Sequence, residues 1–212
     1  MLATSTGAEQ RTVLHNISWE TFEALLRETG SGRGSRFAYE DGTLEIMTPL
    51  FEHENPKCNF GNFIIVLAEE LEIEIKSAGS TTIKKENLKK GIEPDNCYYI
   101  QNELAVRGRE TLDFETDPPP DLAIEIDITS SSVNKFSIYS ALKVPEIWKY
   151  NGSKLKFYEL INNKYVERDY SIAFPLVSAS DINNFIEQSK TKPEIALLKS
   201  FRVWVQRKIN NS

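Results

Sequence analysis

The sequence feature that most constrains this chain is residues 118–132, PPPDLAIEIDITSSS, where acids alternate with aliphatic residues along a strand-like segment. Side chains along a strand alternate between two faces, so the acids share one face and the aliphatic residues share the other. The acids are Asp121, Glu125 and Asp127. Three like charges on one face destabilise a sheet unless something compensates them. The pattern therefore requires a reason for so many carboxylates on a core strand.

Two interpretations are open. The acidic face is solvated, as in an antiparallel sheet with one wet side. Alternatively, the carboxylates gather a divalent cation, because Mg2+ prefers hard oxygen ligands and usually takes one or two protein carboxylates. A second Pro-Asp pair, in EPDNCYYI at residues 93–100, favours the cation. If that segment pairs with the acidic strand, Asp95 approaches Glu125, and Lys135 follows on the next helix. Two carboxylates and a lysine suit metal-assisted phosphodiester hydrolysis.

The rest of the pattern predicts an α/β (α+β) fold with a mixed central sheet flanked by helices. Ser18 and Gly30 bound a short amphipathic helix, and Asp41-Gly42 joins two strands in a hairpin. A second helix is expected to begin at an Asn55 cap, with Pro56 in its first turn. Strands, a helix ending before Pro145, a three-stranded meander and two further helices complete the order.

The expected organisation is a flexible N-terminal segment at 1–16, one domain at 17–175, and a helical extension at 176–212 that packs on the same domain. The chain has 212 residues and a formal net charge of -6, which argues against a surface that grips nucleic acid everywhere. It contains neither a signal-peptide pattern nor an apolar run of the length of a membrane span. We therefore expect a cytoplasmic protein with no membrane partner.

Five segments together resemble the Uma-two family of restriction endonucleases, which has a PD-(D/E)XK nuclease-like fold. They are EHE, GSTT, GIEPDNCYYI, PPPDLAIEIDITSSS and KFSIYSALKVPEIWKY. The resemblance runs from about Ile17 to Tyr170. It implies a restriction-endonuclease-like core in which a helix contributes a glutamate, one strand an aspartate, and the next strand a glutamate. A lysine completes the site.

Carried over to this chain, the resemblance assigns the aspartate role to Asp95, the strand glutamate to Glu125 and the lysine to Lys135. The helix acid is Glu52 or Glu54, beside His53, which is either a base or a polar residue at the helix start. In the most familiar version of the fold the lysine stands two residues after the strand acid, where this chain has Asp127. The implied metal is Mg2+ or Mn2+, with the ligands Asp95 and Glu125, and Asp127 is either a third metal ligand or a solvated neighbour.

Further residues have two readings each. Asp121 supports the site or only bonds a turn, and Tyr139 supports the site from one turn beyond Lys135 or packs in the core. The segment KKENLKK holds four lysines that contact nucleic acid or are solvated: Lys84, Lys85, Lys89 and Lys90. The expected function is a Mg2+-dependent endonuclease that cuts DNA as a homodimer. The alternative is an inactive relative that binds nucleic acid or regulates a partner.

Overall fold

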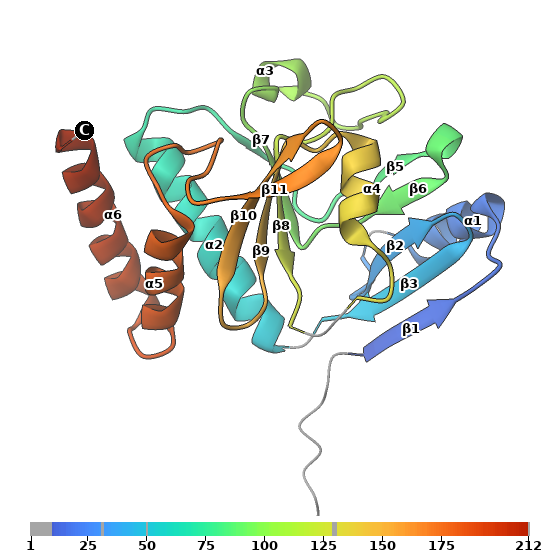
Figure 1. The fold of residues 1–212 in the computed structure, drawn as a ribbon, viewed down its shortest axis with the longest axis horizontal. Helices are drawn as coiled ribbons and strands as arrows, with labels where there is room; N and C mark the ends of the chain where they lie inside the picture. The colour runs from blue at the N-terminus through green and yellow to red at the C-terminus, as the bar shows by residue number, and fades with distance from the viewer. Residues whose placement is uncertain (1–9, 31, 50, 129–130, 212) are drawn as a thin grey trace, which may run out of the picture.

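The computed structural model describes residues 10–30, 32–49, 51–128 and 131–211, with the side chains of residues 51–53 outside the described part. The strands form two sheets (Figure 1). The five-stranded sheet is antiparallel and contains, in order, β1 (Gln10–Leu14), β3 (Thr43–Thr48), β2 (Arg36–Glu40), β6 (Lys90–Ile92) and β5 (Ile83–Lys85).

The six-stranded sheet is mixed, as the sequence predicts for the central sheet. Its order is β11 (Lys164–Arg168), β10 (Leu155–Ile161), β9 (Glu146–Tyr150), β8 (Leu122–Ile126), β7 (Asn96–Tyr99) and β4 (Lys76–Ser77). Strands β8 and β9 run parallel, and the other neighbours run antiparallel. A parallel pair needs a crossover connection, and here the crossover contains a helix. The acidic segment 121–127 therefore lies at the centre of this sheet.

The helices are α1 (Trp19–Thr29), α2 (Phe51–Glu70), α3 (Glu103–Val106), α4 (Lys135–Leu142), α5 (Ala179–Ser189) and α6 (Glu194–Asn210), with a 3-10 turn at Glu86–Leu88. Figure 1 shows α2, α5 and α6 on one side of the mixed sheet and α4 between the two sheets. The packing agrees. Ile124 of β8 belongs to the same core cluster as Phe63 of α2 and Phe201 of α6. Ala123, its neighbour, packs with Ile138 of α4.

Local signals in the sequence explain several element ends. Ser18 caps α1, since its side chain accepts a hydrogen bond from the Thr21 N–H, and Gly30 ends that helix with a φ of 67°. The predicted hairpin between β2 and β3 is confirmed, with Gly42 at a φ of 88° in the turn. Both positive φ values lie in the region that favours glycine.

The predicted Asn55 cap is wrong. Helix α2 begins at Phe51, so Pro56 lies inside it, where it removes one backbone hydrogen bond. Asn55 instead interacts within the helix, because its Oδ1 and its backbone carbonyl accept hydrogen bonds from Asn59 Nδ2 at 2.6 and 3.0 Å. That i to i+4 contact requires a helix that has already begun.

The N-terminal segment was expected to be flexible, and this is wrong for residues 10–14, which form β1. They pair with β3 from Gln10↔Thr48 to Leu14↔Leu44, because the outer edge of β3 offers unpaired backbone groups. The proposed boundary at residue 175 stays a prediction. One core cluster contains Phe174 from before that boundary and Phe185 and Phe201 from after it. No helix among the described residues is long and apolar enough to cross a membrane.

Candidate active site

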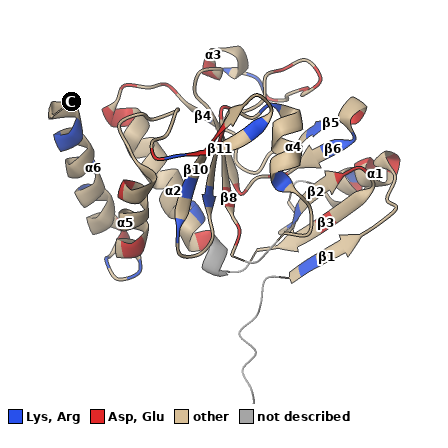
Figure 2. Ribbon diagram, in the orientation of Figure 1, with Lys and Arg blue, Asp and Glu red and all other residues tan. Residues whose placement is uncertain are grey.

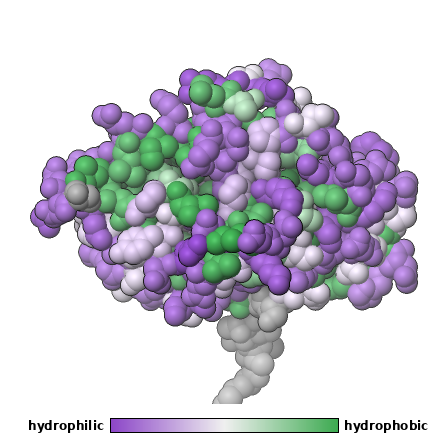
Figure 3. All heavy atoms as spheres, turned by 45° about the horizontal axis from the view of Figure 1, so that its top comes forward, coloured by the Kyte–Doolittle hydropathy of each residue, from purple (hydrophilic) through white to green (hydrophobic). Residues whose placement is uncertain are grey.

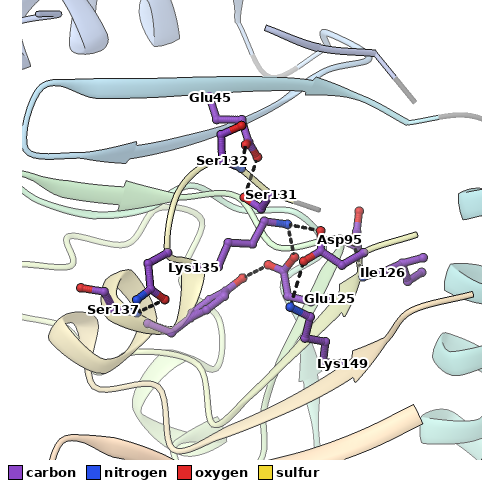
Figure 4. A network of polar contacts seen from close by, with 12 residues as sticks. Glu45, Asp95, Glu125, Ile126, Ser131, Ser132, Lys135, Ser137 and Lys149 are labelled. Carbon is purple, nitrogen blue, oxygen red and sulfur yellow. Dashed lines mark hydrogen bonds and ion pairs between the residues drawn. The ribbon is translucent and has the colours of Figure 1, made fainter. Parts of the chain in front are cut away.

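Asp95 lies next to the central strand because β7 pairs antiparallel with β8. It directly precedes β7, and its N–H donates to the carbonyl of Ile124 at 3.1 Å. Its Oδ2 accepts a hydrogen bond from the Ile126 N–H at 2.7 Å (Figure 4). The prediction that the two Pro-Asp segments form neighbouring strands is therefore confirmed. Asp95 and Glu125 come from the two members of this strand pair.

Helix α4 brings two side chains to the carboxylate of Glu125. The Asn134 side chain caps this helix by accepting from the Ser137 N–H at 3.2 Å. Lys135, the first helical residue, donates to Glu125 Oε2 at 2.5 Å. The Tyr139 hydroxyl, one turn later on the same face, donates to Glu125 Oε1. The displaced lysine therefore reaches the strand acid, as Figure 4 shows.

Asp127 is surrounded by three cationic side chains. Its Oδ1 lies 2.8 Å from Arg11 of β1 and 3.3 Å from the Lys135 ammonium, and its Oδ2 lies 3.0 Å from Lys149 of β9. Lys149 stands opposite Glu125 in the parallel β8–β9 register, which places its side chain on the same face. These charges offset the repulsion among the acids that the sequence pattern implied.

Glu45 joins the five-stranded sheet to the segment that precedes α4. It is buried, and it accepts hydrogen bonds from the Ser131 hydroxyl at 2.9 Å and the Ser132 N–H at 2.6 Å. Arg11 Nη1 lies 2.5 Å from the same carboxylate. Because Ser131 and Ser132 lead directly into α4, Glu45 fixes the approach of Lys135 to the mixed sheet.

Burial and charge shift the pKa values of this cluster in opposite directions. Burial raises the pKa of Glu125 to about 7, although the Lys135 ammonium partly opposes it. Burial also raises the pKa of Asp95. Burial alone would raise the pKa of Asp127, but Lys135, Lys149 and Arg11 together hold it below its ordinary value. For Lys135, burial opposes the charged form, yet Glu125 and Asp127 raise its pKa, so the ammonium stays protonated.

Access to the cluster is limited. Asp95 and Glu125 are 3% and 2% exposed, so these two acids do not line an accessible cleft. The covering groups are the cationic side chains and the segment at 131–134. A hollow of about 330 Å³ reaches the edge of the cluster, lined by Asp127, Ser131, Val133, Asn134, Lys135, Phe136, Lys149 and Asn151.

The comparison with protein families matches residues 19–186 to Uma2, described as a "putative restriction endonuclease". The chain belongs to the Uma2 family. The match covers most of the 212 residues and includes every strand and helix that carries the cluster except β1. The restriction-endonuclease-like fold expected from the motifs is therefore shown. A comparison with curated proteins finds no match.

Not every residue assigned from the Uma2 motifs joins the cluster. Asp121 stands at the other end of the acidic segment, where its carboxylate accepts hydrogen bonds from the N–H groups of Ile100 and Asn102 at 2.7 and 2.9 Å. Glu54 is half-exposed and lies 3.8 Å from Lys57, and it lines a different hollow. The side chains of Glu52 and His53 lie outside the described residues.

The four lysines of KKENLKK lie on and around the β5–β6 hairpin. Lys84 lies 2.5 Å from Glu23, Lys89 lies 3.6 Å from Glu86, and Lys90 lies 2.5 Å from Glu40. The Lys85 side chain has no hydrogen bond or ion pair with the described residues. Much of this positive charge is thus offset locally. Figure 2 shows both signs of charge distributed over most elements.

Three residues of the cluster were not predicted from the sequence. They are Arg11, Glu45 and Lys149. Arg11 and Glu45 belong to strands that are far from β8 and α4 along the chain. No local sequence pattern predicts that the sheet formed by these strands packs over α4. Lys149 had a signal, because the segment after α4 reads as a strand and a parallel pairing with β8 would have placed a basic residue beside Glu125.

The donor set fits one divalent cation through two carboxylates, but the predicted set of three is not formed. Among the described residues, no group of three or more His, Cys, Asp and Glu side chains could hold a metal ion. The Lys135 ammonium bridges Glu125 and Asp127, and Asp127 is also paired with Arg11 and Lys149. Asp95 and Glu125 are the two carboxylates that would hold Mg2+, once the Lys135 ammonium moves off Glu125 Oε2.

Proposed function

We propose that this Uma2 protein is a Mg2+-dependent endonuclease that hydrolyses phosphodiester bonds in DNA. The observation that carries the proposal is the Lys135 ammonium on Glu125, beside Asp95 on the adjacent strand. A protonated lysine beside carboxylates on adjacent strands is the set of charges that suits metal-assisted phosphodiester hydrolysis. The Uma2 family supports nuclease activity, and the metal and the DNA substrate belong to the proposal.

The residues have separate roles in this proposal. Asp95 and Glu125 would hold Mg2+ or Mn2+, which supplies Lewis acidity and lowers the pKa of a bound water. Lys135 stays protonated and offsets negative charge that develops on the phosphoryl oxygens. Tyr139 donates to Glu125 Oε1 and thereby fixes the direction of the other carboxylate oxygen. Asp127 holds Lys149, Arg11 and Lys135 at the rim of the hollow.

Other parts of the proposal rest on the sequence alone. Glu52, His53 and Glu54 stay candidates for the helix contribution, and the lysines of KKENLKK stay candidates for phosphate contacts. Cutting both strands of a duplex with one site in each chain requires two copies, so we propose a homodimer. The cytoplasmic location is likewise a prediction.

Plasmid cleavage tests the proposal. The wild-type protein should nick or linearise a supercoiled plasmid with Mg2+ or Mn2+ and should leave it intact with EDTA. Glu125→Gln should abolish cleavage, while Glu110→Gln, the same change on an exposed loop residue, should cut like wild type. A wild-type protein without metal-dependent cleavage, or a Glu125→Gln variant that still cuts, would refute the assignment.

One observation favours the alternative, a catalytically inactive relative that binds nucleic acid or regulates a partner. The carboxylates of the cluster are buried and already neutralised by Lys135, Lys149 and Arg11. Such a protein would bind DNA equally well with or without Mg2+ and would not cut it. Binding measured by fluorescence anisotropy, alongside the plasmid assay, separates these two functions.

A further inference from the structure

A second hollow, of about 340 Å³, lies where the segment between α1 and β2 meets the loop after β4. Ser80, Thr81 and Thr82 of the GSTT motif line this hollow. The motif has no role in the proposed active site. Its lining consists of Leu26, Gly30, Arg33, Ser35, Arg36, Ala78, Ser80, Thr81, Thr82 and Glu93. Hydroxyl and guanidinium groups thus predominate among its polar side chains. Both kinds of group donate hydrogen bonds.

The two arginines of this hollow have donors without acceptors. The Nε atoms of Arg33 and Arg36 are buried and have no hydrogen-bond partner. The Arg36 side chain makes no hydrogen bond or ion pair with any residue in the described part of the chain. Buried polar groups are nearly always hydrogen-bonded, and an unpaired donor is costly. The two Nε–H groups are therefore buried donors beside the hollow that lack an acceptor among the described residues.

Arg33 is held in position while its Nε stays unpaired. Its guanidinium lies over the Phe37 ring at 4.3 Å, and its terminal nitrogens donate to Glu93 and to the carbonyl of Gly30. A preorganised guanidinium loses little side-chain entropy when it binds a ligand. The position of this donor is thus set before any ligand arrives.

The charge balance of the hollow favours an anion. Two arginines face one acid, Glu93, so the lining carries a net positive charge. Glu93 is also fully engaged, because it accepts from Arg33, from the Thr82 hydroxyl at 2.5 Å and from the Phe37 N–H at 2.9 Å. It cannot turn to Arg36 without breaking these contacts. A phosphate group offers several acceptor oxygens and matches guanidinium geometry.

The hollow adjoins the candidate active site. Glu93 lies two residues before Asp95, and its N–H donates to the Phe37 carbonyl at 2.9 Å, so the segment 93–95 runs from the hollow to the cluster. The positive charge of Arg36 also acts on Asp95, whose pKa it lowers against the larger raising effect of burial. A ligand in the hollow would therefore lie on the segment that leads to Asp95.

We propose that Arg33, Arg36 and the GSTT loop form a phosphate subsite, which binds a backbone phosphate of the nucleic acid next to the one that is cut. The subsite rests on the proposed nuclease function for its choice of a backbone phosphate rather than free phosphate. Its contribution is positioning, because the arginines contact a phosphate that does not react. Ser35 and Ser80, which also line the hollow, are available to donate to the same group.

The test compares Arg36→Gln with Arg202→Gln. Arg202 is a matched control, because it loses the same charge from α6, where it pairs with Glu69 at 2.7 Å. Affinity for a short DNA duplex is measured in EDTA at several salt concentrations, and inorganic phosphate is titrated separately by calorimetry. Arg36→Gln should reduce the salt slope of binding by about one and weaken binding about tenfold. It should also remove phosphate binding, whereas Arg202→Gln should retain both.

Two further variants keep the outcome clear. Arg36→Lys should restore part of the affinity, because one ammonium replaces a forked guanidinium. Ser80→Asp places a carboxylate in the hollow and should weaken phosphate binding even if Arg36→Gln fails to fold. Unchanged slope and phosphate binding in these variants would overturn the subsite. Loss of phosphate binding with an unchanged DNA slope would overturn the assignment to a backbone phosphate.

The result is separable from the nuclease proposal. A wild-type protein that cuts plasmid while Arg36→Gln keeps the wild-type salt slope would refute the subsite alone. A wild-type protein that never cuts, but loses DNA and phosphate binding with Arg36→Gln, would refute the nuclease and support the subsite.

Discussion

The two ends of the acidic segment on β8 hold their carboxylates in different ways. At its start, Asp121 accepts from two backbone N–H groups and from the Asn102 side chain at 2.6 Å. At its end, Glu125 and Asp127 are held by side chains, mainly Lys135 and Lys149. The same segment thus carries one acid, Asp121, that is fixed mainly by backbone donors, and two acids, Glu125 and Asp127, that are held by cationic side chains.

The difference distinguishes a structural acid from a chemical one. Backbone donors belong to the fold and cannot leave without unfolding the loop at residues 100–102. Lysine and arginine side chains can change rotamer and release a carboxylate to a metal ion or substrate. Burial in an apolar setting also raises the pKa of Glu125 to about 7. Perturbed acids beside a hollow are typical of functional sites.

The largest effect expected from this comparison is on catalysis. Lys135→Met should lower the rate of plasmid cleavage at least about 100-fold, because it removes the charge that stabilises the developing phosphoryl negative charge. The fold should persist, since Glu125 can take up a proton once the lysine no longer opposes its raised pKa. Single-turnover cleavage and circular dichroism measure both properties.

The matched control is Lys156→Met, which removes the same charge from an exposed pair with Glu167 on the β10–β11 hairpin. It should cut like wild type. Cleavage by Lys135→Met at the control rate would show that the lysine has no part in the chemistry.

The next effect is on stability. Asp121→Asn should lower the free energy of unfolding by about 3 kcal/mol, because its amide nitrogen cannot accept from the converging donors. For a chain of this size, that corresponds to a fall of about 6–12 °C in melting temperature. Glu125→Gln should cost less, since burial already raises the pKa of Glu125 to about 7 and Asp127 remains as a partner for Lys135.

Thermal unfolding in EDTA compares Asp121→Asn and Glu125→Gln directly. If Glu125→Gln were the more destabilising change, the distinction between structural and chemical acids on this strand would be lost.

A pH series sharpens the same distinction at Glu146, a third buried acid, which accepts from Trp148 Nε1 and the Ala173 N–H at 2.8 Å each. Burial raises its pKa above 4.5, although these hydrogen bonds partly oppose it. The folded protein therefore binds the Glu146 proton more tightly than the unfolded chain does. The resulting stability is fully present below pH 4.5 and is lost as the pH rises through the folded pKa.

The stability lost on Glu146→Gln should accordingly be greatest near pH 4.5 and should shrink toward neutral pH. Denaturant unfolding of the wild type and the variant across this range provides the measurement. A difference that grows with rising pH would mean that Glu146 has a lowered pKa in the fold.

Much of the fold was predictable because local patterns specify it. The alternation at 121–127 gave the two faces of β8, and Ser18, Gly30 and the Asp41-Gly42 turn fixed the ends of their elements. The lysine on α4 was also predictable, from the Pro-Asp pairs and a helix that follows the acidic strand. What failed depends on contacts between distant segments.

Sheet pairing across long separations explains the main errors. Nothing near residue 11 indicates that β1 pairs with β3 and carries Arg11 to Asp127. Burial explains another wrong prediction. The acids looked open to solvent in the sequence, but the five-stranded sheet lies over α4, and Glu45 fixes the segment at 131–132. Figure 3 shows hydrophilic residues over much of one face, with hydrophobic residues gathered between them.

The smallest expected effect concerns the lysines of KKENLKK, which contrast with Lys135 in being partly exposed, and three of which pair with nearby acids. A lysine already paired with a carboxylate gains little from a phosphate, whereas an unpaired one releases a counterion when it binds. Lys85→Gln should therefore lower the salt slope of DNA binding by about 0.9. Lys90→Gln should leave the slope nearly unchanged, because Glu40 and Asp41 already pair with Lys90 at 2.5 and 3.2 Å. Anisotropy titrations at several salt concentrations compare the two variants, and equal reductions in slope would show that the hairpin releases its acids and turns all four lysines to the DNA.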